Sequence, residues 1–191
     1  MQRLLQSHPL ICGEDESHFF ALFGGALNAS DTMTERGKII GPLRYVNRCE
    51  LEDIFRNIWA EIFKGLYAKH PHCEIHLEKT PSHALYLNQI TRLFPNAKVI
   101  FLTRDSRAVT SSLVHAGRTW GDYWAPKTYR NAAIEWHRHV RAVLRWRGLN
   151  PDHSFLQVRY EDVLVDTEGE LSRILRFLFP DAEDLQIETT L

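Results

Sequence analysis

The chain has 191 residues, of which 44% are hydrophobic, enough for one domain with a sizeable core and too many for a disordered protein. Its formal net charge of -1 gives no general attraction for nucleic acid or for an anionic membrane, so a bound anion would need a local cluster of positive charge. The longest apolar runs are too short to cross a bilayer, and no membrane segment is expected within this chain.

The cysteines Cys12, Cys49 and Cys73 are few, odd in number and widely spaced. This pattern argues against a disulfide framework and favours a reducing compartment. The first residues lack the apolar stretch of a signal peptide. A cytoplasmic location is therefore expected, unless a targeting or anchor segment precedes Met1.

The predicted elements begin with residues 1–7, which have the pattern of the end of an amphipathic helix. Residues 22–46 contain the pairs Gly24–Gly25 and Gly41–Pro42 and show little periodicity, so they are predicted to be mostly loop and turn. Across Leu51–Leu66, apolar residues recur at three- and four-residue spacing, which predicts an amphipathic helix with one buried face.

Further along, short apolar runs alternate with amphipathic stretches. The runs predict strands near Ile75–Leu77, at Ala97–Thr103 and at Phe155–Val158, the second of them buried on both faces. The amphipathic stretches predict helices from Thr80–Pro81 to about Phe94, over Asp105–His115, over Lys127–Arg147 with Gly148 as its end, and around Leu171–Leu178. Alternation of this kind implies an α/β fold with a mainly parallel sheet and helices on both faces.

A polar cluster directly follows each predicted strand. These clusters are Glu78–Pro81, Arg104–Arg107 and Arg159–Asp162. The carboxyl ends of parallel strands lie at one edge of a sheet, and ligands bind beyond that edge. The three clusters therefore predict a crevice for a multiply charged anion, lined by a lysine, arginines and a tyrosine.

Arg104 and Ser112 are the strongest candidates for holding a phosphate. A guanidinium and a hydroxyl together suit a phosphate monoester, and the start of the helix adds partial positive charge. The alternative is structural: Arg104 would pair with Asp105 or Glu161.

Several segments resemble, in the same order, those of the sulfotransferases, especially the bacterial and tyrosylprotein-like branch. The quoted segments are Leu4–Pro9, Leu77–Pro81, Leu93–Ile100, Arg104–Ser112, Trp136 and Val158–Asp162. The resemblance implies a three-layer sheet like that of P-loop NTPases. It also implies a reaction in which 3′-phosphoadenosine 5′-phosphosulfate (PAPS) donates a sulfuryl group to an acceptor hydroxyl or amine, without a metal.

The resemblance also implies roles for individual residues. Arg104 and Ser112 match the pair that holds the 3′-phosphate of the donor, and Tyr160 matches a tyrosine near its adenine end. Lys79 matches a lysine that reaches the transferring group, where an ammonium would stabilise developing negative charge. A surface lysine with no such role is the alternative.

Glu16 lies where the family places the carboxylate that removes the proton of the acceptor. One inserted residue would select Asp15 instead, and the acids at 14–16 would also suit a solvated turn. The acceptor stays open among a small molecule, a carbohydrate, a lipid and a protein tyrosine.

The family's glycine-rich phosphate loop is not found in the sequence, and the chain begins where the helix after that loop would already have started. We therefore expect residues 1–191 to be a single sulfotransferase domain that lacks its first strand and P-loop. Because the chain stops at Leu191, soon after the last predicted helix, acceptor-contacting segments are also expected to be missing there.

Three alternatives accompany this hypothesis. One is a non-catalytic remnant of the family that binds the nucleotide without transfer. Another is a P-loop kinase, for which Asp105 would have to help hold Mg²⁺. The third is a metal site at His70, His72, Cys73 and His76, whose spacing matches no usual zinc pattern.

Overall fold

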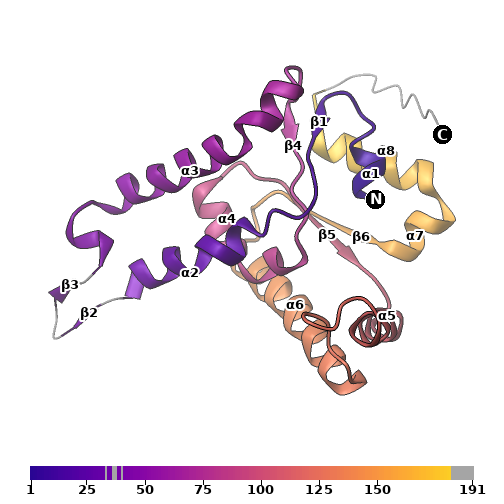
Figure 1. The fold of residues 1–191 in the computed structure, drawn as a ribbon. Helices are drawn as coiled ribbons and strands as arrows, with labels where there is room; N and C mark the ends of the chain where they lie inside the picture. The colour runs from indigo at the N-terminus through magenta and orange to yellow at the C-terminus, as the bar shows by residue number, and fades with distance from the viewer. Residues whose placement is uncertain (33, 36–37, 40, 182–191) are drawn as a thin grey trace. The chain divides into compact units, whose positions relative to one another are not determined.

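A computed structural model of the chain describes residues 1–32, 34–35, 38–39 and 41–181. Its contacts divide the chain into two compact units, Met1–Ala97 and Lys98–Leu191. Parts of the predicted loop at 22–46 and the end of the chain after the last helix lie outside the described residues (Figure 1).

The predicted α/β class is confirmed. Two strand pairs are parallel: β1 (Ile11–Cys12) with β4 (Ile75–His76), and β5 (Val99–Thr103) with β6 (Phe155–Arg159). A short antiparallel pair joins β2 (Thr34–Glu35) to β3 (Lys38–Ile39). The described strands thus form three two-stranded sheets. The three predicted strands are found as β4, β5 and β6, whereas β1 was not predicted.

Strand β5 is less buried than its apolar sequence predicts. Its residues are half-buried, and Leu102 is 39% exposed. The helices that follow β6 pack against β6 itself. These helices and β6 all belong to the second unit. The prediction that both faces of β5 are covered is therefore wrong in this structure.

Helices supply the core of the first unit. They are α1 (Gln2–Leu5), α2 (Phe19–Thr32), α3 (Arg48–Lys69) and α4 (Leu87–Leu93), with 3₁₀ turns η1 (Pro42–Arg44) and η2 (Pro81–Leu85). The predicted helix over 51–66 is confirmed as part of α3, which begins with a capping box between Asn47 and Glu50. The core cluster combines residues of α2, α3 and α4: Phe19, Phe20, Leu27, Leu51, Phe55 and Leu93.

The predicted loop at 22–46 is wrong in its first part, because α2 continues to Thr32. Gly24 does not make a turn there. A Cβ at Gly24 would lie 2.5 Å from the Cδ1 atom of Tyr86, so the glycine makes room for that ring inside the core. Packing of Phe19, Phe20 and Leu27 therefore outweighs the weak helix propensity of the glycines.

The helix predicted from Thr80–Pro81 to about Phe94 is interrupted. It is divided into η2 and α4 at Tyr86, whose φ of -121° and ψ of 18° lie outside the helical region. The ring of Tyr86 packs against Gly24, which ties this residue to α2 and breaks the helix.

The second unit contains α5 (Ser106–Arg118), α6 (Tyr129–Leu149), α7 (Tyr160–Val165) and α8 (Thr167–Leu178), and α5 packs on α6. The predicted helices match α5, α6 and α8, whereas α7 was not predicted. Gly148 does not end α6, because the helix continues to Leu149. A Cβ at Gly148 would have no neighbour within 4 Å, so no close packing requires glycine there.

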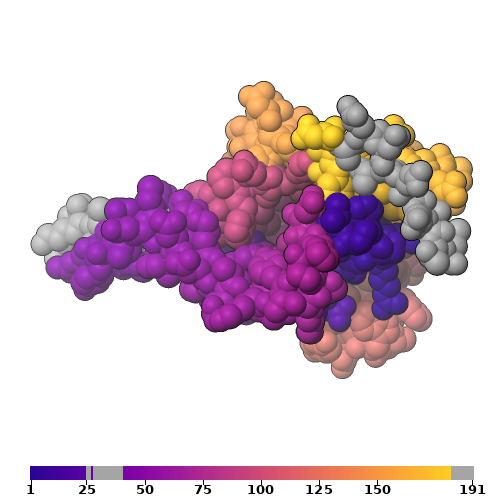
Figure 2. Space-filling view, turned by 90° about the horizontal axis from the view of Figure 1, so that it is seen from above, coloured from indigo at the N-terminus to yellow at the C-terminus, as the bar shows by residue number. Residues whose placement is uncertain are grey.

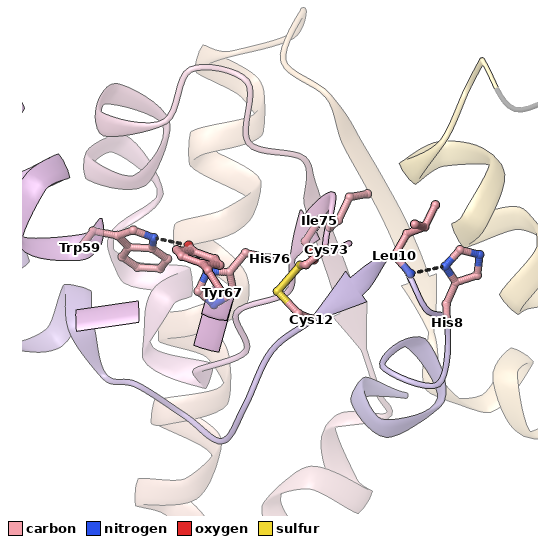
Figure 3. Close-up of a disulfide and its surroundings, with 8 residues drawn as sticks. All are labelled: His8, Leu10, Cys12, Trp59, Tyr67, Cys73, Ile75 and His76. Carbon is pink, nitrogen blue, oxygen red and sulfur yellow. Dashed lines mark hydrogen bonds between the residues drawn. A yellow bond between two sulfur atoms is a disulfide. The ribbon is translucent and has the colours of Figure 1, made fainter. Parts of the chain in front are cut away.

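Cys12 and Cys73 form a disulfide, although the number and spacing of the cysteines argued against a disulfide framework (Figure 3). Their Cα atoms are 5.6 Å apart, although 61 residues separate them in the sequence. The pairing of β1 with β4 brings the two cysteines together, and β1 has only two residues, too few for a sequence pattern. Cys49 is free and exposed.

Candidate active site

The segments that follow β1 and β4 leave the same edge of this strand pair. The strands are parallel, with Cys12 opposite His76, and the N-terminal residues lie against the segment of β4 (Figure 2). The N–H of Leu77 donates to the carbonyl oxygen of Cys12 at 2.7 Å. A Cβ at Gly13 would collide with the carbonyl oxygen of Leu77, so this close approach requires glycine. Residues 14–18 are thereby carried alongside residues 78–80.

A carboxylate and an ammonium meet where these segments run together. The Nζ atom of Lys79 donates to Oε1 of Glu16, across 63 residues of sequence. The two side chains are 48% and 34% exposed, so a ligand can reach them. Nε2 of His18 lies 3.6 Å from the other carboxylate oxygen of Glu16. Asp15, the alternative base, is exposed and makes no such contact with a described residue.

Three polar residues beside this pair were given no individual site role from the sequence, although two of them belong to the predicted cluster Glu78–Pro81. The side chain of Glu78 is 12% exposed, Thr80 is 5% exposed, and His83 is 9% exposed with Nδ1 at 3.8 Å from Glu78. Burial lowers the pKa of His83, and the negative charge of Glu78 opposes that change. Thr80 precedes η2 as predicted, but its side chain makes no capping hydrogen bond. The sequence did contain a signal for two of them: Glu78 and Thr80 lie on either side of Lys79, and in an extended segment such neighbours point to the side opposite Lys79.

In the second unit, Arg104 and Tyr160 follow the two strands of the parallel pair β5–β6. The last pair in register is Thr103 with Arg159, so the next residue of each strand emerges beside its neighbour. The guanidinium carbon of Arg104 lies 4.7 Å from the centre of the Tyr160 ring, a cation–π contact. Two of the three predicted clusters, both in this unit, therefore lie side by side.

The carboxylates near Arg104 have other partners. Asp105 caps α5 by accepting from the N–H groups of Arg107 and Ala108, and it pairs with the side chain of Arg107. The hydrogen bond from Arg107 lowers the pKa of Asp105 most. Glu161 accepts from the N–H of Asp105 at 2.9 Å, which lowers the pKa of Glu161. Among the described residues, Arg104 thus has no carboxylate partner. The alternative in which Arg104 pairs with Asp105 or Glu161 is therefore disfavoured.

Ser112 lies on α5 and is exposed. It is six residues beyond Ser106, where the helix begins, and so lies about 9 Å further along the helix axis. The long side chain of Arg104 would have to extend along the helix for both residues to hold one phosphate. The N–H groups of Arg107 and Ala108 are already bonded to Asp105. The start of the helix therefore offers a phosphate less than the sequence predicts, and Arg104 carries more of the attraction.

The contacts disfavour two of the alternatives. Cys73 is bonded to Cys12, and Nδ1 of His76 lies 2.8 Å from the hydroxyl of Tyr67, so neither is free to complete a zinc site (Figure 3). In the part of the chain that the structure describes, no group of three or more His, Cys, Asp and Glu residues is placed to hold a metal ion. The Asp105 carboxylate that a kinase would need for Mg²⁺ is held by Arg107 and by the helix start.

A profile described as the sulfotransferase family matches residues 1–184 of the 191. The chain belongs to the sulfotransferase family. The family resemblance predicted from the motifs is thereby confirmed, and the membership places the chain in a family of enzymes. In the described residues of this chain, no helix combines the length and apolarity needed to span a bilayer.

Relatives of this chain include putative protein-tyrosine sulfotransferases of two nematodes. The protein of Caenorhabditis briggsae is 29% identical over 128 residues, which are 66% of this chain and 45% of that protein. The protein of Caenorhabditis elegans is 28% identical over 128 residues, 66% and 49% of the two chains. Protein-tyrosine sulfotransferase 1 of Danio rerio is 28% identical over 100 residues, 52% and 28% of the two chains. The chain thus spans about half the length of the nematode relatives.

A solved structure has the same fold as this chain. It is the sulfotransferase domain from the curacin biosynthetic pathway, with a TM-score of 0.60 and 18% sequence identity. The similarity covers 92% of this chain and 67% of that one. It supports the α/β, P-loop-like class. The prediction that a first strand and a phosphate loop are lacking stays a prediction.

Proposed function

We propose that this protein transfers a sulfuryl group from PAPS to a hydroxyl or amine of an acceptor. The observation that carries the proposal is the contact between Glu16 and Lys79, which are 63 residues apart and accessible at the edge of β1 and β4. A carboxylate and an ammonium together are what an acid–base step with developing negative charge requires.

The two residues have different roles. The carboxylate of Glu16 accepts the proton of the acceptor hydroxyl or amine as the new bond to sulfur forms. The ammonium of Lys79 stabilises the negative charge that develops on the oxygen between sulfur and phosphorus as the bond from this oxygen to sulfur breaks. Because the two groups are in contact, an acceptor that reaches Glu16 also comes close to Lys79.

The second unit supplies groups that suit the donor. Arg104 has a guanidinium without a carboxylate partner among the described residues, and its stacking on Tyr160 holds it in one orientation. We assign Arg104 and Ser112 to the 3′-phosphate and Tyr160 to the adenine end. When bound, the donor provides the sulfuryl group and leaves as adenosine 3′,5′-bisphosphate.

The test is a transfer assay with labelled PAPS on the protein. A tyrosine peptide is the first acceptor, because relatives are named protein-tyrosine sulfotransferases, followed by an oligosaccharide and a small alcohol. Labelled product that is lost in Glu16→Gln and Lys79→Ala, with binding of the bisphosphate retained, would support the roles. Binding of the bisphosphate without transfer to any acceptor would instead indicate the non-catalytic alternative.

We also infer an oxidising compartment. The predicted cytoplasmic location depended partly on the cysteine pattern, and the Cys12–Cys73 disulfide removes that support, since such bonds persist mainly in oxidising environments. Thiol titration of the denatured, unreduced protein should find one thiol per chain, that of Cys49. Three thiols in protein isolated from its native compartment would restore the cytoplasmic prediction.

A further inference from the structure

The segment Glu78–Thr80 presents its side chains to two environments. Lys79 is 48% exposed, whereas the side chain of Glu78 is 12% exposed and Thr80 is 5% exposed. In an extended segment alternate residues point to opposite sides. One side therefore carries the proposed catalytic lysine, and the other carries two buried polar groups for which the proposed reaction has no direct use.

These buried groups bind the backbone next to Glu16. An oxygen of Glu78, Oε1, accepts from the N–H of Ser17 at 3.3 Å and from the hydroxyl of Thr80 at 2.7 Å. The Thr80 oxygen in turn accepts from the N–H of His18 at 3.3 Å. The two peptide groups that directly follow Glu16 are thus held by the two residues on either side of Lys79.

The backbone at His18 needs such support. Its φ of 52° lies in the left-handed region, which a residue other than glycine rarely adopts. His18 is also the point where the chain enters α2, since its carbonyl oxygen accepts the first helical hydrogen bond, from Leu22. The sharp change of direction there turns residues 14–17 toward β4, and the bonds to Glu78 and Thr80 keep it in place.

We propose that Glu78 and Thr80 are positioning residues, which hold the 16–18 backbone so that the Glu16 carboxylate stays on the Lys79 ammonium. They act through Glu16 and do not touch the reacting groups. This inference rests on the proposed function for its catalytic consequence, but the hydrogen bonds themselves can be tested without it.

The matched variants are Thr80→Val and Thr80→Ser. Valine keeps the shape of threonine and removes the hydroxyl that accepts from His18, whereas serine keeps the hydroxyl. Since a small misplacement of a catalytic group costs up to about 100-fold, we expect Thr80→Val to lower kcat about 10- to 100-fold. KM for PAPS should change less than about twofold, because donor-holding residues are unaffected, and Thr80→Ser should restore most of kcat.

A double variant separates positioning from general damage to the structure. If Thr80 acts through Glu16, Thr80→Val should have little further effect on kcat in a Glu16→Gln background. If Thr80→Val lowers kcat by the same factor in the wild type and in the Glu16→Gln variant, the proposal is overturned. Glu78→Met, which keeps the length of the side chain and removes both acceptor oxygens, serves as the disrupting variant if Thr80→Val does not fold, and the same dependence on Glu16 is expected.

Hydrogen exchange keeps the inference testable if no acceptor is ever sulfated. The amide of His18 should exchange at least about tenfold faster in Thr80→Val than in the wild type, with Thr80→Ser close to the wild type. Absence of transfer by the wild type would then count against the proposed function alone. Unchanged exchange at His18, or an unchanged kcat in Thr80→Val of an active enzyme, would overturn the positioning role.

Discussion

The two units hold their candidate site residues in different ways. In the first unit, Glu16 and Lys79 meet across 63 residues, and a disulfide and side-chain hydrogen bonds keep their segments together. In the second unit, Arg104 and Tyr160 each come one residue after a five-residue strand, and the register of the two strands brings them together.

This difference indicates which contacts the candidate residues of each unit depend on. A two-residue strand pair has too few backbone hydrogen bonds to hold an edge, so β1 and β4 depend on contacts made by side chains. Strands β5 and β6 are long enough to set the position of Arg104 by register alone. Loss of a tertiary contact should therefore damage the first unit, whereas the second should respond mainly to changes in the site residues themselves.

The largest expected effect comes from the disulfide. Replacing both Cys12 and Cys73 by serine should lower the free energy of unfolding by about 4 kcal/mol, because the bond closes a loop of about 60 residues in the unfolded chain. Denaturant unfolding without reductant measures this change. Cys49→Ser, at the free and exposed cysteine, is the control and should change stability by less than about 0.5 kcal/mol. Equal denaturant midpoints for the double variant and the wild type would show that the first unit does not depend on this disulfide.

The next effect concerns the proposed donor site. Arg104→Ala should weaken binding of adenosine 3′,5′-bisphosphate by about 2–3 kcal/mol, because a charge-assisted phosphate contact is lost. Calorimetric titration would show this as a dissociation constant about 30- to 150-fold higher. Arg107→Ala is the control, since the side chain of Arg107 is 91% exposed and already paired with Asp105. If Arg104→Ala and the wild type bind the bisphosphate with equal affinity, Arg104 does not contribute to the donor site.

A smaller effect is expected at Tyr160. Tyr160→Ala removes the ring beneath Arg104 and should weaken bisphosphate binding by about 0.5–1 kcal/mol, the value of an exposed cation–π contact. Tyr160→Phe keeps the ring and should bind nearly as well as the wild type. If the phenylalanine variant is as weak as the alanine variant, the hydroxyl of Tyr160 contributes directly to binding, and the cation–π contact with Arg104 does not account for the effect.

The pH dependence of stability tests the first unit again. Burial lowers the pKa of His76 below its ordinary value of 6.5, against the opposing charge of Glu78. The unfolded chain then binds more protons than the folded one as the pH falls below 6.5, so the free energy of unfolding should decrease there and level off above it. His76→Gln should reduce this dependence in denaturation between about pH 7.5 and about pH 5.5.

Much of the fold was predictable because its patterns are local. The spacing of apolar residues in α3, α5, α6 and α8 and the apolar runs of β5 and β6 are repeated over several residues, and both periods survive in the structure. The rule that parallel strands end at one edge also placed Arg104 beside Tyr160.

The amino-acid sequence by itself therefore determined the α/β class, the sulfotransferase family and the side chains that follow each strand. Only the tertiary structure decided that Cys12 bonds to Cys73, that Gly24 lies inside a helix, and that Glu78 and Thr80 hold the backbone after Glu16. The physical reason is the range of the interactions: periodicity acts between neighbours in the chain, whereas these contacts join residues about 60 positions apart and leave no repeated pattern.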